Sequence, residues 1–245
     1  MLPKQPNQSL IDGLACLQCL TVHAESVGVR EVARELALET TRAHRLLKTL
    51  AHLGLAEQGE KGKYHVGPGI HVLAAMSLFG SGLIRRAIAP LESLHRHNLI
   101  VAMGVLWRDH VAYLYHWSSG MRSSEAIGKA NLYPATLSGL GMALLAQQPA
   151  AEVQALYRGK EIPGYPLGIA ALLMDLQKAR TMGYAEVIRG KPDRTISVCI
   201  DRGNPQATVA IGLAGATIQG RVSELVESLQ TAASQIATNG TAHGL

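Results

Sequence analysis

The sequence predicts an α+β protein with a small helical domain at its amino end and a larger domain built on a mostly antiparallel sheet. Three observations favour this fold class. Apolar residues recur at helical spacing through residues 10–53, two pairs of short β-rich runs surround tight turns, and amphipathic stretches lie between those pairs. With 245 residues and 47% apolar side chains, the chain is long enough for two domains that each bury a core.

The composition and charge of the chain indicate which classes of molecule it binds and in which compartment it lies. The chain has a formal net charge of +5, and residues 40–50 contain Arg42, Arg45 and Lys48 but no acidic residue. Aromatic residues make up only 4% of the chain, which argues against the stacking surfaces that bind single-stranded nucleic acids. The three cysteines form no regular framework, and the polar amino end lacks the apolar segment of a signal peptide. We therefore expect a soluble, cytoplasmic protein that does not enter a membrane.

Three helices are predicted in the first domain. Leucines at helical spacing predict a helix over 10–23, with Ser9 and Asp12 resembling a capping box at its start. A second, short helix covers 30–36. A third helix, capped by threonine, covers 40–53 and places alanine and leucine on one face and basic residues on the other.

The short connection between the second and third helices predicts a helix-turn-helix, and a hairpin over 55–66 with a glycine-rich turn adds a wing. We expect Arg42 to reach base edges in double-stranded DNA, and Arg45 and Lys48 to neutralise phosphates. The alternative is an ordinary helical hairpin with a solvated basic face. The candidate DNA-binding residues are Arg30, Thr40, Thr41, Arg42, His44, Arg45, Lys48, Lys61 and Lys63.

The second domain is predicted as a sheet with flanking helices. A helix over 70–79 and a helix that runs toward His97 are separated by a Gly-Ser-Gly break. The remaining predicted elements are a hairpin over 99–107 and 110–116, a glycine-rich segment over 137–146 followed by a helix, a helix over 169–182, strands over 196–200 and 207–214, and a closing helix over 219–237.

Two motifs within residues 9–66 are specific enough to compare with known families. They are His44-Arg45-Leu46-Leu47 and Tyr64-x-x-Gly67, and with them this segment resembles the DNA-binding domain of IclR-type bacterial transcriptional regulators. The similarity continues at 138–146, which is similar to a Thr-Ala-x-Gly-Lys-Ala-x-Leu-Ala stretch of the family, and at Gly183-Tyr184-Ala185.

The resemblance implies a winged helix-turn-helix over 1–68, a linker helix over 69–81 and a GAF-like effector-binding and oligomerisation domain over 82–245. It also implies a homodimer, or a pair of dimers, on a double-stranded DNA operator. By position in the family, the candidate effector-binding residues are Met103, Val105, Ser138, Gly139, Arg189, Cys199, Gly212 and Ala214.

The effector expected from these positions differs from that of relatives with small-acid sites. Gly212 and Ala214 stand where some members have serines, and Arg189 stands where an acid is frequent. We therefore expect open space instead of hydroxyl donors, and a small organic effector that is larger or more apolar than glyoxylate. The alternative is a packed core with no ligand, which would make the chain a degenerate DNA-binding scaffold.

The cysteines raise two further alternatives. Cys16, Cys19 and His23 share one face of the first helix, but a structural zinc site needs a fourth ligand. We expect this face to be buried between subunits, with no metal and no cofactor. Cys199 also suggests a Cys-dependent small-molecule hydrolase, but the sequence has no nucleophile elbow, P-loop or zinc-protease motif, so we do not expect an enzyme.

Overall fold

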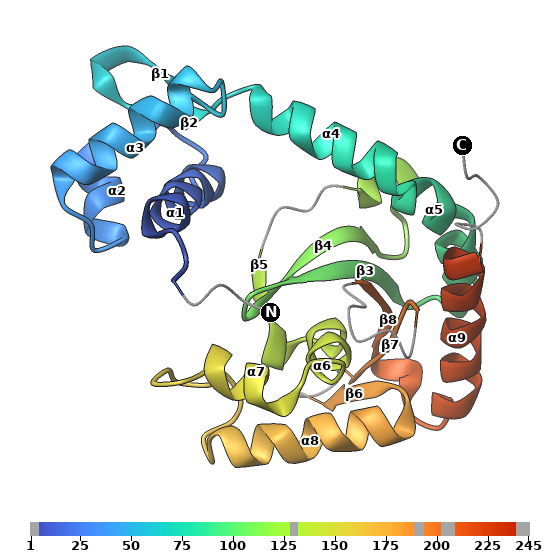
Figure 1. The fold of residues 1–245 in the computed structure, drawn as a ribbon. Helices are drawn as coiled ribbons and strands as arrows, with labels where there is room; N and C mark the ends of the chain where they lie inside the picture. The colour runs from blue at the N-terminus through green and yellow to red at the C-terminus, as the bar shows by residue number, and fades with distance from the viewer. Residues whose placement is uncertain (1–4, 128–131, 189–193, 202–208, 239–245) are drawn as a thin grey trace. The chain divides into compact units, whose positions relative to one another are not determined.

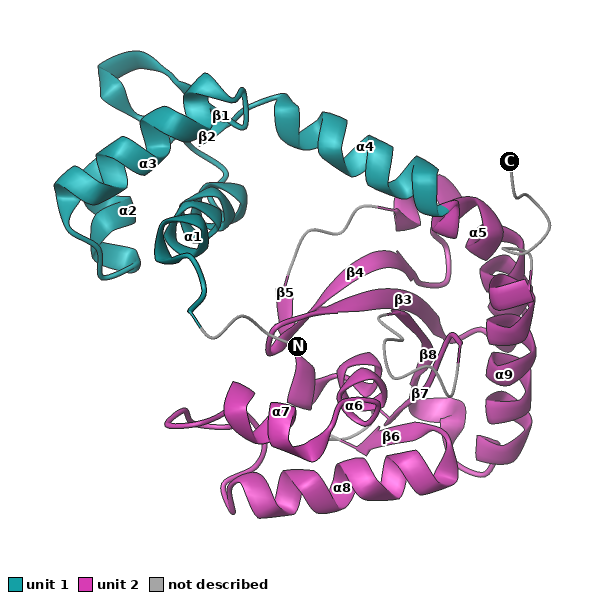
Figure 2. Ribbon diagram, in the orientation of Figure 1, with its two compact units in different colours: residues 1–81 teal, residues 82–245 magenta. Residues whose placement is uncertain are grey.

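The computed structural model describes residues 5–127, 132–188, 194–201 and 209–238 and divides into two units, Met1–Ser81 and Gly82–Leu245 (Figures 1 and 2). The first unit consists of α1 (Gln8–Val22), α2 (Val29–Glu35), α3 (Thr40–His52), β1 (Ala56–Gln58), η1 (Glu60–Gly62), β2 (Tyr64–Val66) and α4 (Gly69–Ser81). The three helices and the hairpin predicted from the sequence are present, and they have the order of a winged helix-turn-helix.

The core of the first unit joins all three helices to the hairpin. Leu20 of α1, Val32 of α2, Leu47 of α3 and Tyr64 of β2 are buried together. Tyr64 also exchanges two backbone hydrogen bonds with Val27, which ties the hairpin to the segment between α1 and α2. The helices and the wing therefore form one packed body.

Two predictions about α1 are wrong. The helix is capped by Asn7, whose side chain accepts a hydrogen bond from the Leu10 amide, and not by Ser9 and Asp12. Cys16 and Cys19 are buried in the core of their own unit, not between subunits, because α1 turns this face toward α2 and α3.

In α4, every residue from 71 to 81 is exposed although the helix is mostly apolar. Among the described residues, no single helix is both long and apolar enough to cross a membrane; α4 and the segment that follows it reach that length and hydropathy only when they are counted together.

The second unit is a six-stranded antiparallel sheet with helices on both faces (Figure 1). Its strands are β3 (Ile100–Trp107), β4 (His110–Trp117), β5 (Leu132–Pro134), β6 (Ala185–Ile188), β7 (Arg194–Cys199) and β8 (Val209–Gly215), in the order β5-β4-β3-β8-β7-β6. Its helices are α5 (Leu83–Ser93), η2 (Leu94–His97), η3 (Ser123–Ala126), η4 (Ala135–Leu137), α6 (Gly139–Leu145), α7 (Ala150–Leu156), α8 (Ile169–Met182), η5 (Ala216–Ile218) and α9 (Val222–Thr238). Strands β5 and β6 were not predicted.

Each face of the sheet has its own core. α5 and α9 pack on one face with residues such as Leu91, Met103 and Leu225, and α6, α7 and α8 pack on the other with residues such as Leu140 and Leu172. The alternation of side chains along β3 and β4 thus decides which core each residue enters.

A β-bulge interrupts this alternation in the hairpin of β3 and β4. Met103 pairs with Tyr115, but the next residue, Gly104, pairs with Tyr113, so Leu114 is an additional residue in β4. As a result Leu114 and Tyr115 both contact the core under α5 and α9, whereas Tyr113 faces α6. The bulge therefore directs Tyr113 to the face where a cavity lies.

Candidate functional site

The exposed face of α3 carries a basic stripe. Thr41, Arg45 and Lys48 lie four and three residues apart, so they share one side of the helix, and all three are exposed. The opposite side buries Ala43 and Leu47 in the core of the unit. Among the described residues, no salt bridge or side-chain hydrogen bond engages Arg45 or Lys48, so both cations are available to an anionic partner.

Arg42 is engaged within the protein. Its Nε donates to Oδ2 of Asp12 over 2.7 Å, and the Asp12 side chain is 10% exposed. Gln8 donates to the other carboxylate oxygen, also over 2.7 Å. The pair joins α3 to α1 across 30 positions of sequence, which is why reasoning from local patterns missed it.

Arg42→Ala is expected to lower the free energy of unfolding of the first unit by about 1–3 kcal/mol, because it leaves the buried Asp12 carboxylate without its charged partner. Urea denaturation followed by circular dichroism measures the change. Arg45→Ala is the control and is expected to stay within about 0.5 kcal/mol of the wild type. Equal effects of the two variants would contradict a stabilising role of the Arg42–Asp12 pair.

The other candidate DNA-binding residues also lie in the first unit. Arg30 is exposed on α2, Thr40 is exposed at the start of α3, and His44 is half-buried in that helix. Lys61 and Lys63 are exposed in and after the turn of the hairpin. Their contact with DNA stays a prediction.

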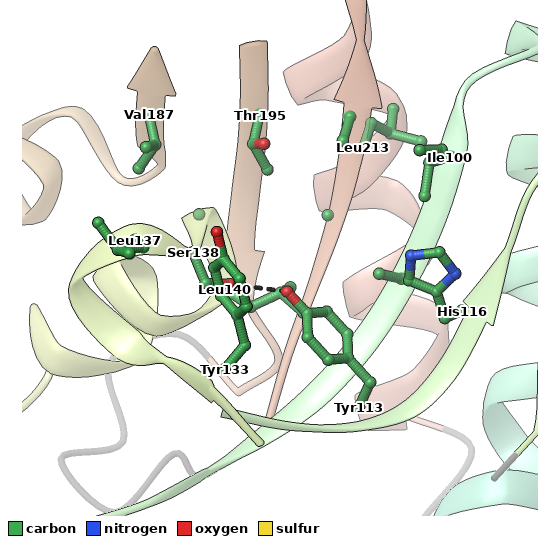
Figure 3. A pocket seen from close by; sticks show the side chains of 14 residues that line it. Ile100, Tyr113, His116, Tyr133, Leu137, Ser138, Leu140, Val187, Thr195 and Leu213 are labelled. Atoms are coloured by element: carbon green, nitrogen blue, oxygen red, sulfur yellow. Dashed lines mark hydrogen bonds between the residues drawn. The ribbon is translucent and has the colours of Figure 1, made fainter. Parts of the chain in front are cut away.

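A cavity of about 250 Å³ lies in the second unit, between the sheet and the start of α6 (Figure 3). It is lined by residues from all six strands of the sheet and from the segment that leads into α6: Ile100, Ala102, Tyr113, His116, Tyr133, Leu137, Ser138, Gly139, Leu140, Val187, Thr195, Gly212, Leu213 and Ala214. None of these described lining residues is Asp, Glu, Lys or Arg. The cavity therefore offers apolar surface together with neutral hydrogen-bonding groups and one imidazole.

Two hydroxyl groups meet at one end of the cavity. The Tyr113 hydroxyl lies 3.2 Å from Oγ of Ser138 (Figure 3). Ser138 is also the N-cap of α6, where its Oγ accepts a hydrogen bond from the Gly141 amide. Burial raises the pKa of Tyr113, so its phenol stays neutral. The ring of His116 approaches that of Tyr113 edge-on, with centroids 5.7 Å apart.

Four of the eight expected effector residues line this cavity: Ser138, Gly139, Gly212 and Ala214. Met103, Val105 and Cys199 do not line this cavity. Met103 points to the opposite face of the sheet, into the core under α5 and α9. Arg189 lies outside the described residues.

Most of the polar lining was missed from the sequence. Tyr113 and His116 come from β4, Tyr133 from β5 and Thr195 from β7. Local spacing does not relate them, and the bulge at Leu114 reverses the phase expected for β4. Of these four residues, Tyr113 and His116 lie in a segment that the sequence predicts as a strand, 110–116.

Gly212 does not leave open space, which corrects the expectation from the sequence. A Cβ at this position would overlap Oγ of Ser197 and lie 2.9 Å from the Ile196 carbonyl oxygen. At Gly139 a Cβ would lie 2.5 Å from Cγ2 of Thr195. Both glycines therefore allow α6 to approach β7 and β8 closely, and the cavity owes its position to that approach.

Gly212→Ala is expected to lower the free energy of unfolding of the second unit by about 1–3 kcal/mol, because the added methyl group meets backbone that cannot move aside. Gly80→Ala, in a helix where a Cβ meets no atom within 4 Å, is the matched control and should be neutral or stabilising. Thermal unfolding monitored by calorimetry distinguishes them. A neutral Gly212→Ala would mean that α6 and β8 separate more easily than their packing indicates.

Cys199 is engaged away from the cavity. Its thiol is 5% exposed and donates to the Ala143 carbonyl over 3.2 Å. The Asp109 carboxylate contacts His110 at 3.0 Å and Lys160 at 3.0 Å.

Comparison with known proteins gives a consistent result. The family model of the IclR helix-turn-helix domain matches residues 9–60. The chain is 29% identical to the HTH-type transcriptional regulator KdgR of Escherichia coli over 195 residues, which cover 76% of this chain and 73% of that protein. It is 28% identical to the transcriptional repressor IclR of Escherichia coli over 220 residues, covering 85% and 80%.

A solved structure supports the fold. An IclR homologue from Microbacterium hydrocarbonoxydans, complexed with 4-hydroxybenzoate, superposes with a TM-score of 0.69 and 23% identity, covering 96% of this chain and all of that chain. The winged helix-turn-helix, the antiparallel sheet and the similarity to known regulators along most of the sequence agree: this chain belongs to the IclR family of DNA-binding transcriptional regulators.

Proposed function

We propose that α3 reads operator DNA from the major groove and that a small organic effector in the cavity of the second unit controls this binding. The observation that carries the proposal is the stripe of Thr41, Arg45 and Lys48. It is exposed, has no acidic partner in the part of the chain that the structure describes, and lies on the second helix of a helix-turn-helix. Such a helix presents side chains to base edges and phosphates together.

The proposal assigns a role to each segment. Residues 1–68 bind DNA, residues 69–81 form a linker helix, and residues 82–245 bind the effector and contribute to assembly. In the first segment Thr40 and Thr41 offer hydroxyls to the phosphates beside the start of α3, and Lys61 and Lys63 contact the backbone from the wing. Arg42 acts mainly by fixing α3 against α1 through Asp12.

The chemistry of the cavity supports a compact effector with both apolar and oxygen-bearing groups. Its volume of about 250 Å³ lies below the range of about 300–1,000 Å³ that is typical of drug-sized ligands. Tyr113, Ser138 and Thr195 offer hydroxyls, while Leu140 and Val187 offer apolar contacts. The homologue that holds 4-hydroxybenzoate supplies a first probe from this class.

Dimerisation is part of the proposal. Leu10 and Leu14 on α1 and Met76 and Phe79 on α4 are large apolar side chains that remain exposed within the chain, with Phe79 exposed at 87%. A second copy of the chain, or a pair of dimers, would cover them. Two recognition helices related by a two-fold axis then require a palindromic operator with half-sites about one helical turn, or a multiple of it, apart.

Two measurements on the full chain test the proposal. Selection from a random DNA pool should enrich a palindromic sequence, and a thermal-shift screen of small phenols and carboxylic acids should yield compounds that stabilise the protein and change its affinity for that sequence. Enrichment without a palindrome would contradict the dimeric binding mode. A compound that stabilises the protein but leaves DNA affinity unchanged would contradict control by the cavity.

A further inference from the structure

Three side chains with metal-binding atoms converge in the first unit, away from the basic stripe. Cys19 lies in α1, His23 is the C-cap that directly follows α1, and Glu35 is the last residue of α2. Sγ of Cys19 and Nε2 of His23 each lie 3.2 Å from Oε2 of Glu35. All three potential ligand atoms lie within 4.8 Å of one another.

This spacing matches a tetrahedral metal site. Zinc binds sulfur at about 2.3 Å, and nitrogen and oxygen at about 2.0–2.2 Å, so two ligand atoms on one ion are about 3.3–3.8 Å apart. The two separations from Glu35 are 3.2 Å, just below this range, and the Cys19–His23 separation is at most 4.8 Å. Thiolate and imidazole ligands favour zinc and exclude calcium and magnesium, which prefer oxygen alone.

The third ligand comes from a different helix than the sequence pattern indicated. Cys16, Cys19 and His23 share a face of α1, but Cys16 is fully buried in the hydrophobic core. Glu35, which follows His23 by 12 residues, supplies the third ligand atom in place of Cys16. Because no alternation or helical period links these positions, only the packing of α1 and α2 against α3 brings the set together.

We infer that Cys19, His23 and Glu35 form a zinc site that joins α1 to α2. One thiolate and one carboxylate balance the two positive charges of the ion. The Cys19 side chain forms the buried base, at 6% exposure, while the His23 and Glu35 side chains are exposed at 33% and 37%. The ion can enter from the exposed side of the site, and a water molecule supplies the fourth ligand.

Without metal, the same three residues form a hydrogen-bonded set. Burial and the hydrogen bond to the Glu35 carboxylate raise the pKa of the Cys19 thiol to about 12, so the thiol keeps its proton. A metal ion displaces this proton and replaces two hydrogen bonds with three coordinate bonds. The experiment must therefore detect the ion itself and not only the importance of the residues.

Cobalt titration of the reduced, chelator-treated full chain without an affinity tag provides that detection. We expect one equivalent of Co²⁺ to bind, with the intense visible bands of a tetrahedral ion and a thiolate-to-cobalt charge-transfer band, and Zn²⁺ to abolish both. Cys19→Ala should abolish the charge-transfer band. His23→Ala and Glu35→Gln should weaken binding by at least about tenfold.

Matched variants separate this site from other cobalt ligands in the chain. Cys16→Ala removes the buried thiol one turn before Cys19 in α1. Glu31→Gln removes a carboxylate from the first turn of α2, the helix that carries Glu35. Both variants should bind cobalt as the wild type does. Retention of the band in His23→Ala and Glu35→Gln at full affinity, or its loss in Cys16→Ala, would overturn the assignment.

Thermal unfolding provides a second measurement that does not depend on spectra. Zinc at about 100 times its dissociation constant should raise the Tm of the first unit by about 10 °C in the wild type and in Glu31→Gln. It should not raise the Tm of His23→Ala, whose half-exposed side chain is dispensable for the core. The absence of both a cobalt spectrum and a zinc-dependent shift would show that the three residues serve only as a hydrogen-bonded set.

Discussion

Replacing Arg45 and Lys48 together with alanine is expected to weaken binding to a selected operator by about 100-fold per subunit. Each residue contributes about 1–3 kcal/mol if it contacts a base or phosphate, and neither has a partner within the described part of the chain that would offset the loss. The slope of log affinity against log salt should also fall by about 0.9 for each phosphate contact removed. Fluorescence anisotropy at several salt concentrations measures both quantities.

A charge-matched control decides whether this loss is local. Arg158→Ala with Lys178→Ala removes two exposed positive charges from the second unit and lowers the net charge equally. Operator binding by this control should remain within about twofold of the wild type. If the control weakens binding as strongly as the α3 variant, the loss of affinity results from the lower net charge of the protein. The assignment of α3 as the recognition helix then fails.

The first unit was largely predictable from sequence because its organisation is local. Helical spacing, the short connection after α2 and the glycine-rich turn each lie within a few residues, and they determine three helices and a wing. The contacts that the sequence did not predict join residues far apart in the chain. The Arg42–Asp12 pair spans 30 positions, and the convergence of Cys19 with Glu35 spans 16, so both depend on helix packing that no local pattern encodes.

The cavity was less predictable for a related reason. The family resemblance identified the start of α6 and the β8 strand, and four of its residues do line the cavity. Side-chain direction, however, is decided by strand phase, and a single bulge in β4 changes that phase. A β5 strand of only three residues, which brings Tyr133 to the cavity, is too short to show alternation.

Ala214→Leu is expected to abolish the thermal shift produced by whichever small phenol or carboxylic acid stabilises the wild type. Ala214 lines the cavity from β8, paired with Ile100 on one side and Thr195 on the other, and both of those residues also line it. Three added carbon atoms in a cavity of about 250 Å³ occupy space that the effector needs. Since Ala214 is half-buried, the variant should fold, unlike a substitution at Gly212.

The same variant also tests whether the cavity and the DNA-binding surface are separate. Operator affinity of Ala214→Leu without effector should equal that of the wild type if the cavity acts only through ligand-dependent population of a second state. Ala216→Leu, exposed two residues further along, is the matched control and should retain the full shift. A full shift in Ala214→Leu would place the effector elsewhere, whereas loss of operator affinity in the absence of effector would mean that leucine itself imposes the liganded state.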